Sequence, residues 1–251
     1  MEHILKIKQY SALAALLLLV AGCGNGESEP KESSSSNGSS TAPAEVSAVP
    51  ENLKNAAYEY YGLGEEATLT YIVKMNDDVP ARDCPQTVTF VEMEDGSAKF
   101  RVTRVGWPSG IGSETLLLND EGVFTKALNF GVLDSPALQV PADLALGSEW
   151  EAPMRVVNGS QIFSTIFKSR AVREEKTTVE AGTFDCLVIE ADMTSTITGS
   201  PNPSKDGIAT SKIVAYYAKG VGTIKMTMEG SQADGSALKA YIELKSIGEA
   251  Q

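Results

Sequence analysis

Histidine is almost absent from this chain of 251 residues, since the single copy is His3. A serine or cysteine nucleophile that needs a histidine base, and a metal centre with histidine ligands, are therefore excluded from residues 4–251. Serine–lysine chemistry and carboxylate pairs stay open, but the lysines and carboxylates are spaced as on an ordinary surface. We accordingly expect no enzyme, no catalytic residue, no metal site and no cofactor.

Long hydrophobic runs are also missing. The apolar stretch at residues 12–22 follows Lys6 and Lys8 and has only 11 residues. A transmembrane helix needs roughly 20 apolar residues, whereas the apolar region of a signal peptide needs about 7 to 15. We expect residues 1–22 to be a secretion signal that is removed.

The end of this leader, Val20-Ala21-Gly22-Cys23, resembles the lipobox of bacterial lipoproteins. The resemblance implies that Cys23 becomes the mature N-terminus and carries a diacylglyceryl group, often with a further acyl chain such as palmitate. Two acyl chains anchor a protein stably, whereas one binds only marginally. A free cysteine after an ordinary signal peptide is the alternative. We expect a chain lipid-anchored to a bacterial membrane and outside the cytoplasm, on the outer membrane facing the periplasm in a Gram-negative cell.

Aromatic residues are missing between Tyr10 and Tyr58, and serine is abundant there, with the run SSSSNGSS at residues 33–40. Such a polar stretch cannot bury enough apolar surface to offset the entropy lost on ordering. We expect residues 23–49 to be a flexible tether with an average reach of about 28 Å.

Basic residues are outnumbered. Without residues 1–22 the chain has 19 lysines and arginines against 32 aspartates and glutamates, a formal charge of −13. Binding to nucleic acid through phosphates needs a basic cluster, and attraction to anionic lipid needs the same. We expect no nucleic-acid partner and a charge that serves solubility.

Residues 50–251 are expected to form one domain dominated by alternating apolar and polar residues. This period of two indicates strands with one buried face. The expected inward positions are Leu69, Tyr71, Val73 and Met75; Phe100 and Val102; Ile224, Met226 and Met228; and Leu238, Ala240, Ile242 and Leu244.

Hairpin signals separate these runs, among them Asp95-Gly96, Asn158-Gly159, Asp206-Gly207 and Asp234-Gly235. Short turns join antiparallel neighbours. We therefore predict a mainly β fold: one large, curved antiparallel sheet, an open or half barrel, built as a meander of about ten or eleven strands. A short helix is expected at Pro50–Tyr61, and residues 129–146 are expected to be an irregular crossing or an edge.

The concave face of such a sheet is either filled by side chains, which is slightly favoured, or leaves a pocket for an apolar ligand. Two loops carry weaker signals. The stretch MNDDVPARD gathers Asp77, Asp78 and Asp83, but its spacing is not that of an EF-hand, which favours a solvated turn. In GWPSGIGS, Trp107 either covers the core, the commoner outcome, or contacts a ligand or membrane.

Two cysteines besides Cys23 are present, Cys84 and Cys186. An exported protein can form and keep a disulfide, and this pair would close a loop of about 100 residues. The alternative is two separate thiols, because Cys186 lies in TFDCLVIE, a buried-strand pattern in which cysteine acts as a small hydrophobic residue.

The stretches TTVEAGTFDCLVIE (177–190) and AYYAKGVGTIKM (215–226) are similar to paired strand motifs of a broad group of uncharacterised bacterial envelope lipoproteins. LALGSEW (144–150) looks like the G-x-x-W that often precedes them. The matching positions, read as structural, are Gly147, Trp150, Gly182, Phe184, Cys186, Tyr217, Gly220 and Gly222.

This group looks related to the curved sheets of the lipoprotein carriers LolA and LolB, and that similarity implies an acyl-chain cavity. The sequence lacks the long amphipathic helices that line such a carrier cavity, so lipoprotein transport is not inferred. Our leading hypothesis is a lipid-anchored β domain that binds an apolar or amphiphilic ligand. The rival is a structural or interaction protein of the envelope with a filled core, and no protein partner is indicated.

Overall fold

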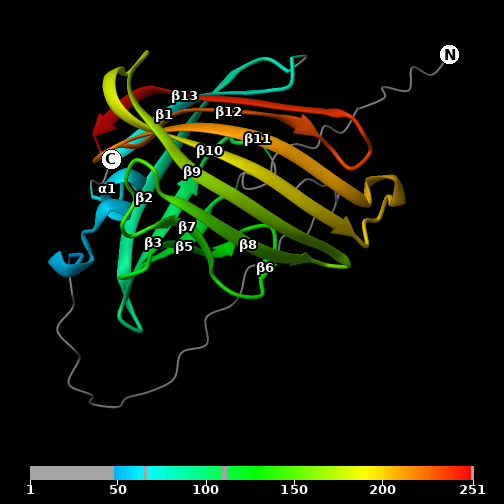
Figure 1. Ribbon diagram of the computed structural model, residues 1–251, viewed down its shortest axis with the longest axis horizontal. Coiled ribbons are helices and arrows are strands. Elements are labelled where there is room, and N and C mark those ends of the chain that lie inside the picture. Colours follow the sequence, from blue (N-terminus) through cyan, green and yellow to red (C-terminus); the bar gives the residue numbers. More distant parts are fainter. Residues whose placement is uncertain (1–47, 65–66, 78, 109–111, 250–251) are drawn as a thin grey trace, which may run out of the picture.

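The computed structural model describes residues 48–64, 67–77, 79–108 and 112–249 (Figure 1). The expected leader, Cys23 with its expected lipid, and nearly all of the expected tether lie outside the described residues. A 3-10 helix, η1 (Glu51–Leu53), and an α-helix, α1 (Ala56–Tyr61), precede the strands. A second 3-10 helix, η2 (Pro203–Lys205), lies between β10 and β11.

The described residues form one antiparallel sheet of 13 strands, in the order β6-β8-β9-β10-β11-β12-β13-β1-β2-β3-β4-β5-β7. The predicted fold class is confirmed. The strands are β1 (Ala67–Met75), β2 (Arg82–Glu94), β3 (Ser97–Arg104), β4 (Glu114–Leu118), β5 (Gly122–Leu128), β6 (Val132–Leu133), β7 (Ala137–Pro141), β8 (Glu149–Asn158), β9 (Gln161–Val179), β10 (Gly182–Thr198), β11 (Gly207–Ala218), β12 (Gly222–Ser231) and β13 (Ala237–Glu249).

Two meanders make up this sheet. Strands β1 to β5 are neighbours in chain order, as are β8 to β13, and β13 pairs with β1 to join the two sets. The prediction of ten or eleven strands was too low for the described chain, because β6 has two residues and β7 five. Strands this short show no usable alternation. The expectation of a crossing or edge at residues 129–146 is confirmed, since both short strands lie there, at opposite ends of the sheet order.

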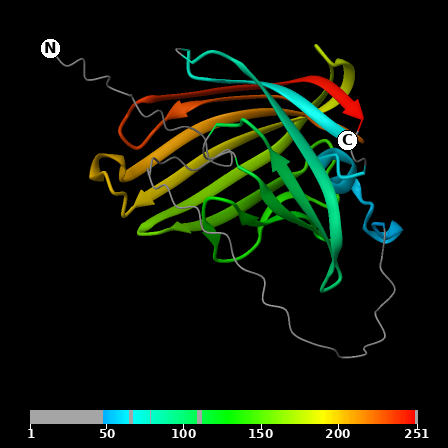
Figure 2. The ribbon, with the colours of Figure 1, turned by 180° about the vertical axis from the view of Figure 1, so that it is seen from behind.

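The sheet curls until its two ends approach each other and enclose an interior (Figures 1 and 2). Across the remaining seam, the indole N–H of Trp150 on β8 donates to the carbonyl oxygen of Gln139 on β7, with 3.2 Å between the heavy atoms. A sheet of this many strands must hide its apolar face by curling or splitting. Here it curls into a nearly closed barrel shape.

The inner face follows the alternation that the sequence predicts. On β1, β3, β12 and β13 the residues expected to point inward are at most 8% exposed. The turn at Asp95-Gly96 also matches its prediction, since both residues have positive φ, at 48° and 81°. This is the conformation that a two-residue hairpin turn requires.

The N-terminal helix differs in detail from the single helix expected at Pro50–Tyr61. Asn55 is extended, and its side-chain oxygen accepts a hydrogen bond from the Tyr58 N–H, which starts α1 there and separates it from η1. Asparagine favours this capping position over the helix interior. Val49, expected at the end of the tether, is buried in the same core cluster as Leu53. None of the described helices has the length and apolar character that crossing a membrane would require.

The end of α1 lies directly against the turn between β11 and β12. Gly62 follows the helix with φ +71°, and a Cβ placed on it would lie 2.4 Å from the carbonyl oxygen of Val221. The Gly220 N–H donates to the Glu59 carbonyl at 2.9 Å, and Lys219 pairs with the Glu59 carboxylate at 3.0 Å. Backbone approach this close is open only to glycine, so α1 is held at one end of the curved sheet.

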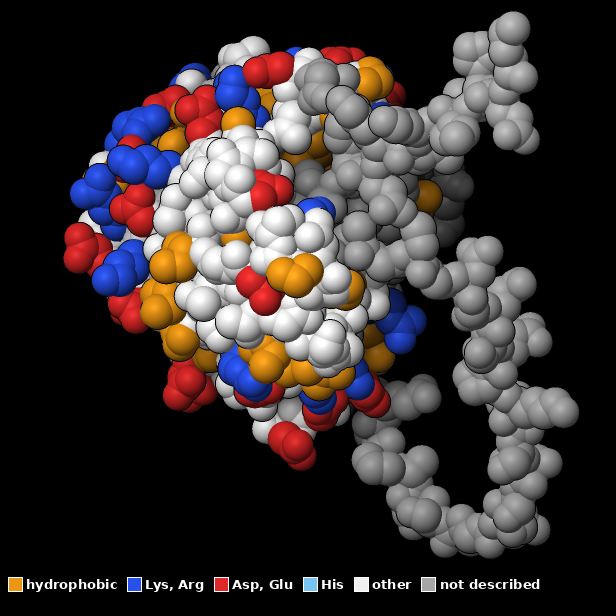
Figure 3. Space-filling model, turned by 90° about the vertical axis from the view of Figure 1, so that its right-hand side faces the viewer, with side chains coloured by type: hydrophobic (Ala, Val, Ile, Leu, Met, Phe, Trp, Pro, Cys, Tyr) orange, Lys and Arg blue, Asp and Glu red, His pale blue; other side chains and the backbone are white. Residues whose placement is uncertain are grey.

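The outer face of the sheet carries charged side chains of both signs, interspersed along one side of the molecule in Figure 3. On β9 and β10 they form exposed pairs such as Arg170 with Glu190 and Lys176 with Asp185, both at 2.9 Å. Exposed pairs of this kind contribute about 0 to 1 kcal/mol each. They make the outer face of these strands largely polar.

Candidate functional site

The interior of the curved sheet holds a cavity of about 160 Å³. Its lining comes from the end of α1 and from most strands of both meanders, and it borders both hydrophobic core clusters. The sequence left open whether side chains fill the interior or leave a pocket for an apolar ligand. In the structure they fill most of the interior, but a pocket remains. The cavity is the candidate site.

A buried ion pair forms part of its wall. Arg104, at the end of β3, donates from Nη2 to Oε1 of Glu114, at the start of β4, over 2.8 Å. The hydroxyl of Thr125 on β5 donates to the other carboxylate oxygen over 3.1 Å. The side chains of Arg104 and Glu114 are only 15% and 8% exposed. Both oxygens of Glu114 are thus engaged by neighbours within the sheet.

The rest of the Arg104 guanidinium is equally engaged. Nε donates to the side-chain oxygen of Gln86 on β2 at 2.8 Å, and Nη1 donates to the Gly112 carbonyl at 2.9 Å. The guanidinium carbon also lies 5.4 Å from the ring centroid of Trp107. A guanidinium with every nitrogen bonded and one aromatic neighbour is fixed in position.

Trp107 packs against the core, which is the commoner of the two outcomes predicted for it. Its indole N–H donates to the Pro85 carbonyl at 3.2 Å, and its ring meets that of Tyr71 edge-on with centroids 5.5 Å apart. Because it also lines the cavity, Trp107 contributes to the candidate site from the core rather than as an exposed contact.

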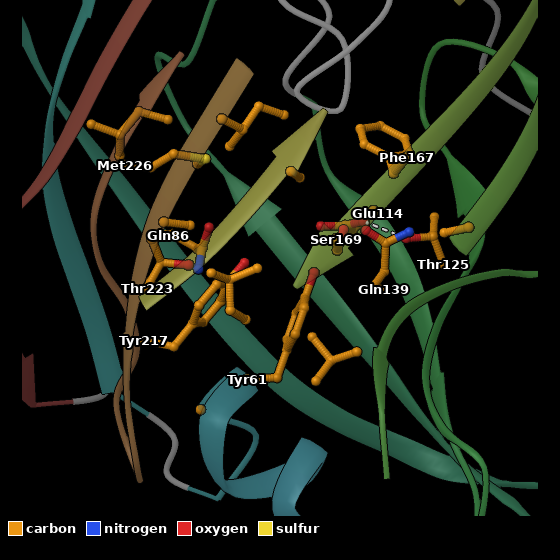
Figure 4. Close-up of a pocket in the computed structure, with 18 of the residues that line it drawn as sticks. Tyr61, Gln86, Glu114, Thr125, Gln139, Phe167, Ser169, Tyr217, Thr223 and Met226 are labelled. Atoms are coloured by element: carbon orange, nitrogen blue, oxygen red, sulfur yellow. Dashed lines mark hydrogen bonds between the residues drawn. The ribbon is translucent and has the colours of Figure 1, made fainter. Parts of the chain in front are cut away.

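The end of the cavity nearest α1 is polar. Figure 4 shows Tyr61 rising from the helix with its hydroxyl directed toward Glu114, Ser169 and Gln139. Burial, with a smaller contribution from the Glu114 charge, raises the pKa of Tyr61 well above its usual value. The phenol therefore stays protonated at neutral pH and can donate a hydrogen bond.

The opposite end is apolar. Figure 4 shows Phe167 on β9 and Met226 on β12 on the side of the cavity away from α1. Further apolar side chains line the cavity, among them Leu69, Val88, Ile213 and Ile242. An apolar wall with a few convergent polar groups is the usual composition of a small-molecule site.

The tyrosines of the cavity wall predict a loss of stability at high pH. Burial is the largest cause that raises the pKa of Tyr61, Tyr71 and Tyr217. Their protons are held more tightly in the folded state, so this stability is fully present below pH ~10, where unfolded tyrosine titrates, and falls above it. We expect the unfolding free energy to drop by at most about 4 kcal/mol per pH unit there. Chemical denaturation over a pH series measures it; an unfolding free energy that stays level up to pH ~12 would contradict the assignment.

Some of the positions matched through the lipoprotein motifs lie at this site. Trp150 and Tyr217 line the cavity, and Gly220 and Gly222 form the turn that receives α1. Gly147 before β8 and Gly182 at the start of β10 have positive φ, Phe184 packs against the core from β10, and Cys186 is buried. The matched positions therefore include both residues of the cavity wall and residues with structural roles.

Sequence reasoning missed Arg104, Glu114, Gln86 and Tyr61. A signal for the first two was present, because Arg104 continues the inward positions Phe100 and Val102, and Glu114 shares a face with Leu116. A charged residue on the apolar face of a strand is expected to have a buried partner. Gln86 and Tyr61 carry no comparable signal, since neither type is unusual in a strand or at a helix end.

Of the three aspartates in MNDDVPARD, Asp77 follows β1 and Asp83 lies on β2, and both pair with lysines of β13, whereas Asp78 lies outside the described residues. Asp77 pairs with Lys239 at 2.7 Å and Asp83 with Lys245 at 2.6 Å. The hydrogen bond from Lys239 lowers the pKa of Asp77. Among the described residues no group of His, Cys, Asp or Glu side chains is arranged to hold a metal ion.

Cys84 and Cys186 are both buried free thiols in the structure, the second of the two alternatives left open by the sequence. Their strands, β2 and β10, are five positions apart in the sheet order. Strands lie about 4.8 Å apart and facing sheets about 10 Å apart, whereas a disulfide spans a Cα distance of less than about 7 Å. The topology thus separates the two cysteines.

We expect both thiols to react with an alkylating reagent when the protein is unfolded without reductant. In the folded protein both should be protected, because burial removes them from the reagent and also raises the pKa of each thiol. Intact mass before and after alkylation measures this. An unfolded, unreduced protein that gains no alkyl group at these positions would show a bridge instead.

Comparisons with known proteins give remote matches. A search of curated proteins found no relative. A candidate lipoprotein of Parabacteroides distasonis is 14% identical, with 75% of this chain and 98% of that one covered, at a TM-score of 0.48. A candidate exported protein of Bacteroides fragilis with a YmcC-like fold is 12% identical, with 76% and 99% covered, at 0.49. The hypothetical lipoprotein YmcC of Escherichia coli is 12% identical, with 71% and 84% covered, at 0.31.

The resemblance to LolA and LolB stays a prediction. A family model matches a part of the chain that includes the three motif stretches, at residues 144–150, 177–190 and 215–226. Residues 132–234, which reach from β6 to the turn before β13, are similar to the DUF3108-like family.

Proposed function

We propose that this chain is a lipid-anchored protein, held outside the cytoplasm through Cys23, that binds a small apolar or amphiphilic molecule inside its curved sheet. The single observation that carries the proposed ligand binding is the interior cavity of about 160 Å³, with an apolar end and a polar end. The proposed anchoring is supported by the lipobox-like Val20-Ala21-Gly22-Cys23.

The size of the cavity limits the ligand. A cavity of about 150 Å³ holds a molecule the size of benzene, and drug-sized ligands need roughly 300 to 1,000 Å³. At about 160 Å³, the site is matched to a molecule of benzene size or to the end of a longer chain. A complete long acyl chain would need the interior to expand.

The proposal is for binding rather than catalysis. Glu114 is the one carboxylate among the described lining residues, and Arg104 and Thr125 occupy both of its oxygens. A general base must be able to reach the proton that it removes. Glu114 is instead held as part of the wall.

Native mass spectrometry of residues 44–251 tests the proposal, because this segment contains every described element and both core clusters. We expect reproducible small-molecule adducts after gentle purification, or uptake of benzene-sized probes by the stripped protein. A protein that stays at its apo mass and takes up neither these probes nor a fluorescent fatty acid would favour the rival function, a structural or interaction protein of the envelope.

A filling substitution provides the matched control. Ala215 on β11 lines the cavity, and Ala215→Phe would place a ring inside it. We expect this variant to lose probe binding while it remains folded, since the ring occupies free volume. The same change at the exposed Ala127 on β5 should leave binding unchanged. Equal binding by the two variants would place the ligand elsewhere.

A further inference from the structure

We propose that the cavity selects an uncharged ligand whose polar end is a hydrogen-bond-accepting oxygen, such as an alcohol, ester or ketone, over a carboxylate or an ammonium ion of the same shape. This inference rests on the proposed binding function and specifies the ligand class. The preference for an uncharged ligand follows from the charged side chains and the hydrogen-bond donors of the cavity wall.

The wall is electrically balanced. Arg104 and Glu114 are the only charged side chains among the described residues that line the cavity, and they pair at 2.8 Å. A ligand that brought in one charge would leave that charge without a counter-ion in a buried site. Burying an unpaired ion is costly, whereas a neutral polar group needs only a hydrogen bond.

The pair is also closed to exchange with a ligand. Glu114 accepts from Arg104 and Thr125, and each nitrogen of the guanidinium donates to a neighbour. A ligand carboxylate could reach Arg104 only by displacing Glu114, and a ligand ammonium could reach Glu114 only by displacing Arg104. Either exchange leaves one partner of a buried pair alone, which is strongly unfavourable.

Several hydrogen-bond donors at the cavity remain for a ligand. Among them, the Tyr61 hydroxyl and the side-chain nitrogen of Gln86 have no protein partner within the described residues. The orientation of the Gln86 amide follows from Arg104, because a guanidinium only donates and so fixes the oxygen of Gln86 on its side. Both side chains lie around the central space in Figure 4. A neutral oxygen acceptor satisfies these donors without adding charge.

The test compares three probes of benzene size that differ in charge: benzyl alcohol, benzoate and benzylammonium. Calorimetry or ligand-observed NMR at neutral pH with residues 44–251 measures their affinities. We expect benzyl alcohol to bind at least about tenfold more tightly than either ion. Tighter binding of benzoate or benzylammonium would overturn the inference and leave the proposed function standing. Binding of none of the three, nor of toluene, would remove both.

Variants of the pair test the cause. Glu114→Gln preserves shape but leaves Arg104 unbalanced, so the preference should shift toward benzoate by at least about tenfold. The double variant Arg104→Gln/Glu114→Gln is neutral again and should return to benzyl alcohol. An unchanged preference in folded Glu114→Gln would refute the charge argument. If that variant does not fold, the comparison of probes in the unmodified protein decides alone.

Tyr61→Phe tests the donor separately. Loss of one hydrogen bond should weaken benzyl alcohol about three- to tenfold. Toluene, which makes no hydrogen bond, should bind this variant as it binds the original protein. Equal weakening of both probes would indicate a change of cavity shape and would contradict the role given to the hydroxyl.

Discussion

Replacement of Arg104 by methionine is expected to lower the free energy of unfolding by about 3 to 5 kcal/mol. The change removes the counter-charge of Glu114, whose side chain is 8% exposed, and leaves that carboxylate with Thr125 as its remaining hydrogen-bond donor. It also removes the donor from the oxygens of Gln86 and Gly112. Urea unfolding followed by tryptophan fluorescence measures the loss, since Trp107 and Trp150 both line the cavity.

Arg173→Met is the matched control for this prediction. Arg173 on β9 also pairs with a glutamate, Glu175, at 2.6 Å, but its side chain is 43% exposed. An exposed pair contributes about 1 kcal/mol at most. If Arg104→Met cost no more than Arg173→Met, the buried pair would have no special role in stability.

A second variant separates the unpaired charge from the lost packing. In Arg104→Met/Glu114→Leu both charges are gone, and we expect most of the lost stability to return. Replacing a whole buried ion pair by apolar residues is often neutral or stabilising. The pair would then be retained at a cost to stability, as expected for residues that set which ligand the cavity accepts. A double variant that remains as unstable as Arg104→Met would refute this account.

Alanine at Gly62 is expected to destabilise the protein by about 2 to 5 kcal/mol. Of this, about 1 to 2 kcal/mol comes from the left-handed backbone conformation and about 1 to 3 kcal/mol from steric overlap. The overlap is with backbone, since the new Cβ would lie 2.4 Å from the Val221 carbonyl oxygen. The helix α1 would have to move away from the turn between β11 and β12, and Tyr61 would move with it.

Gly220 provides the control within the same turn. Its φ of +76° is equally left-handed, but a Cβ there meets nothing within 4 Å. Gly220→Ala should therefore cost only about 1 to 2 kcal/mol. Probe binding should fall in Gly62→Ala and persist in Gly220→Ala. Equal losses of stability in the two variants would mean that the close approach of α1 to the turn is unimportant.

The sequence by itself determined which residues point inward on most strands and where several hairpins turn. Leu69, Tyr71, Val73 and Met75 illustrate this, because a period of two is a local property that does not depend on the strand's partners. The predictions of a leader and of a lipid on Cys23 rest on sequence alone, since both lie outside the described residues. A signal that the export apparatus recognises from sequence needs no fold to be readable.

Only the tertiary structure decided how the strands close and what the interior contains. The pairing of β13 with β1 joins segments at opposite ends of the domain, and no local pattern encodes such a contact. The same strand order separates Cys84 from Cys186 and brings Arg104 beside Glu114 and Gln86. The cavity is the volume that packed side chains leave unfilled, so it exists only once every neighbouring strand is in place.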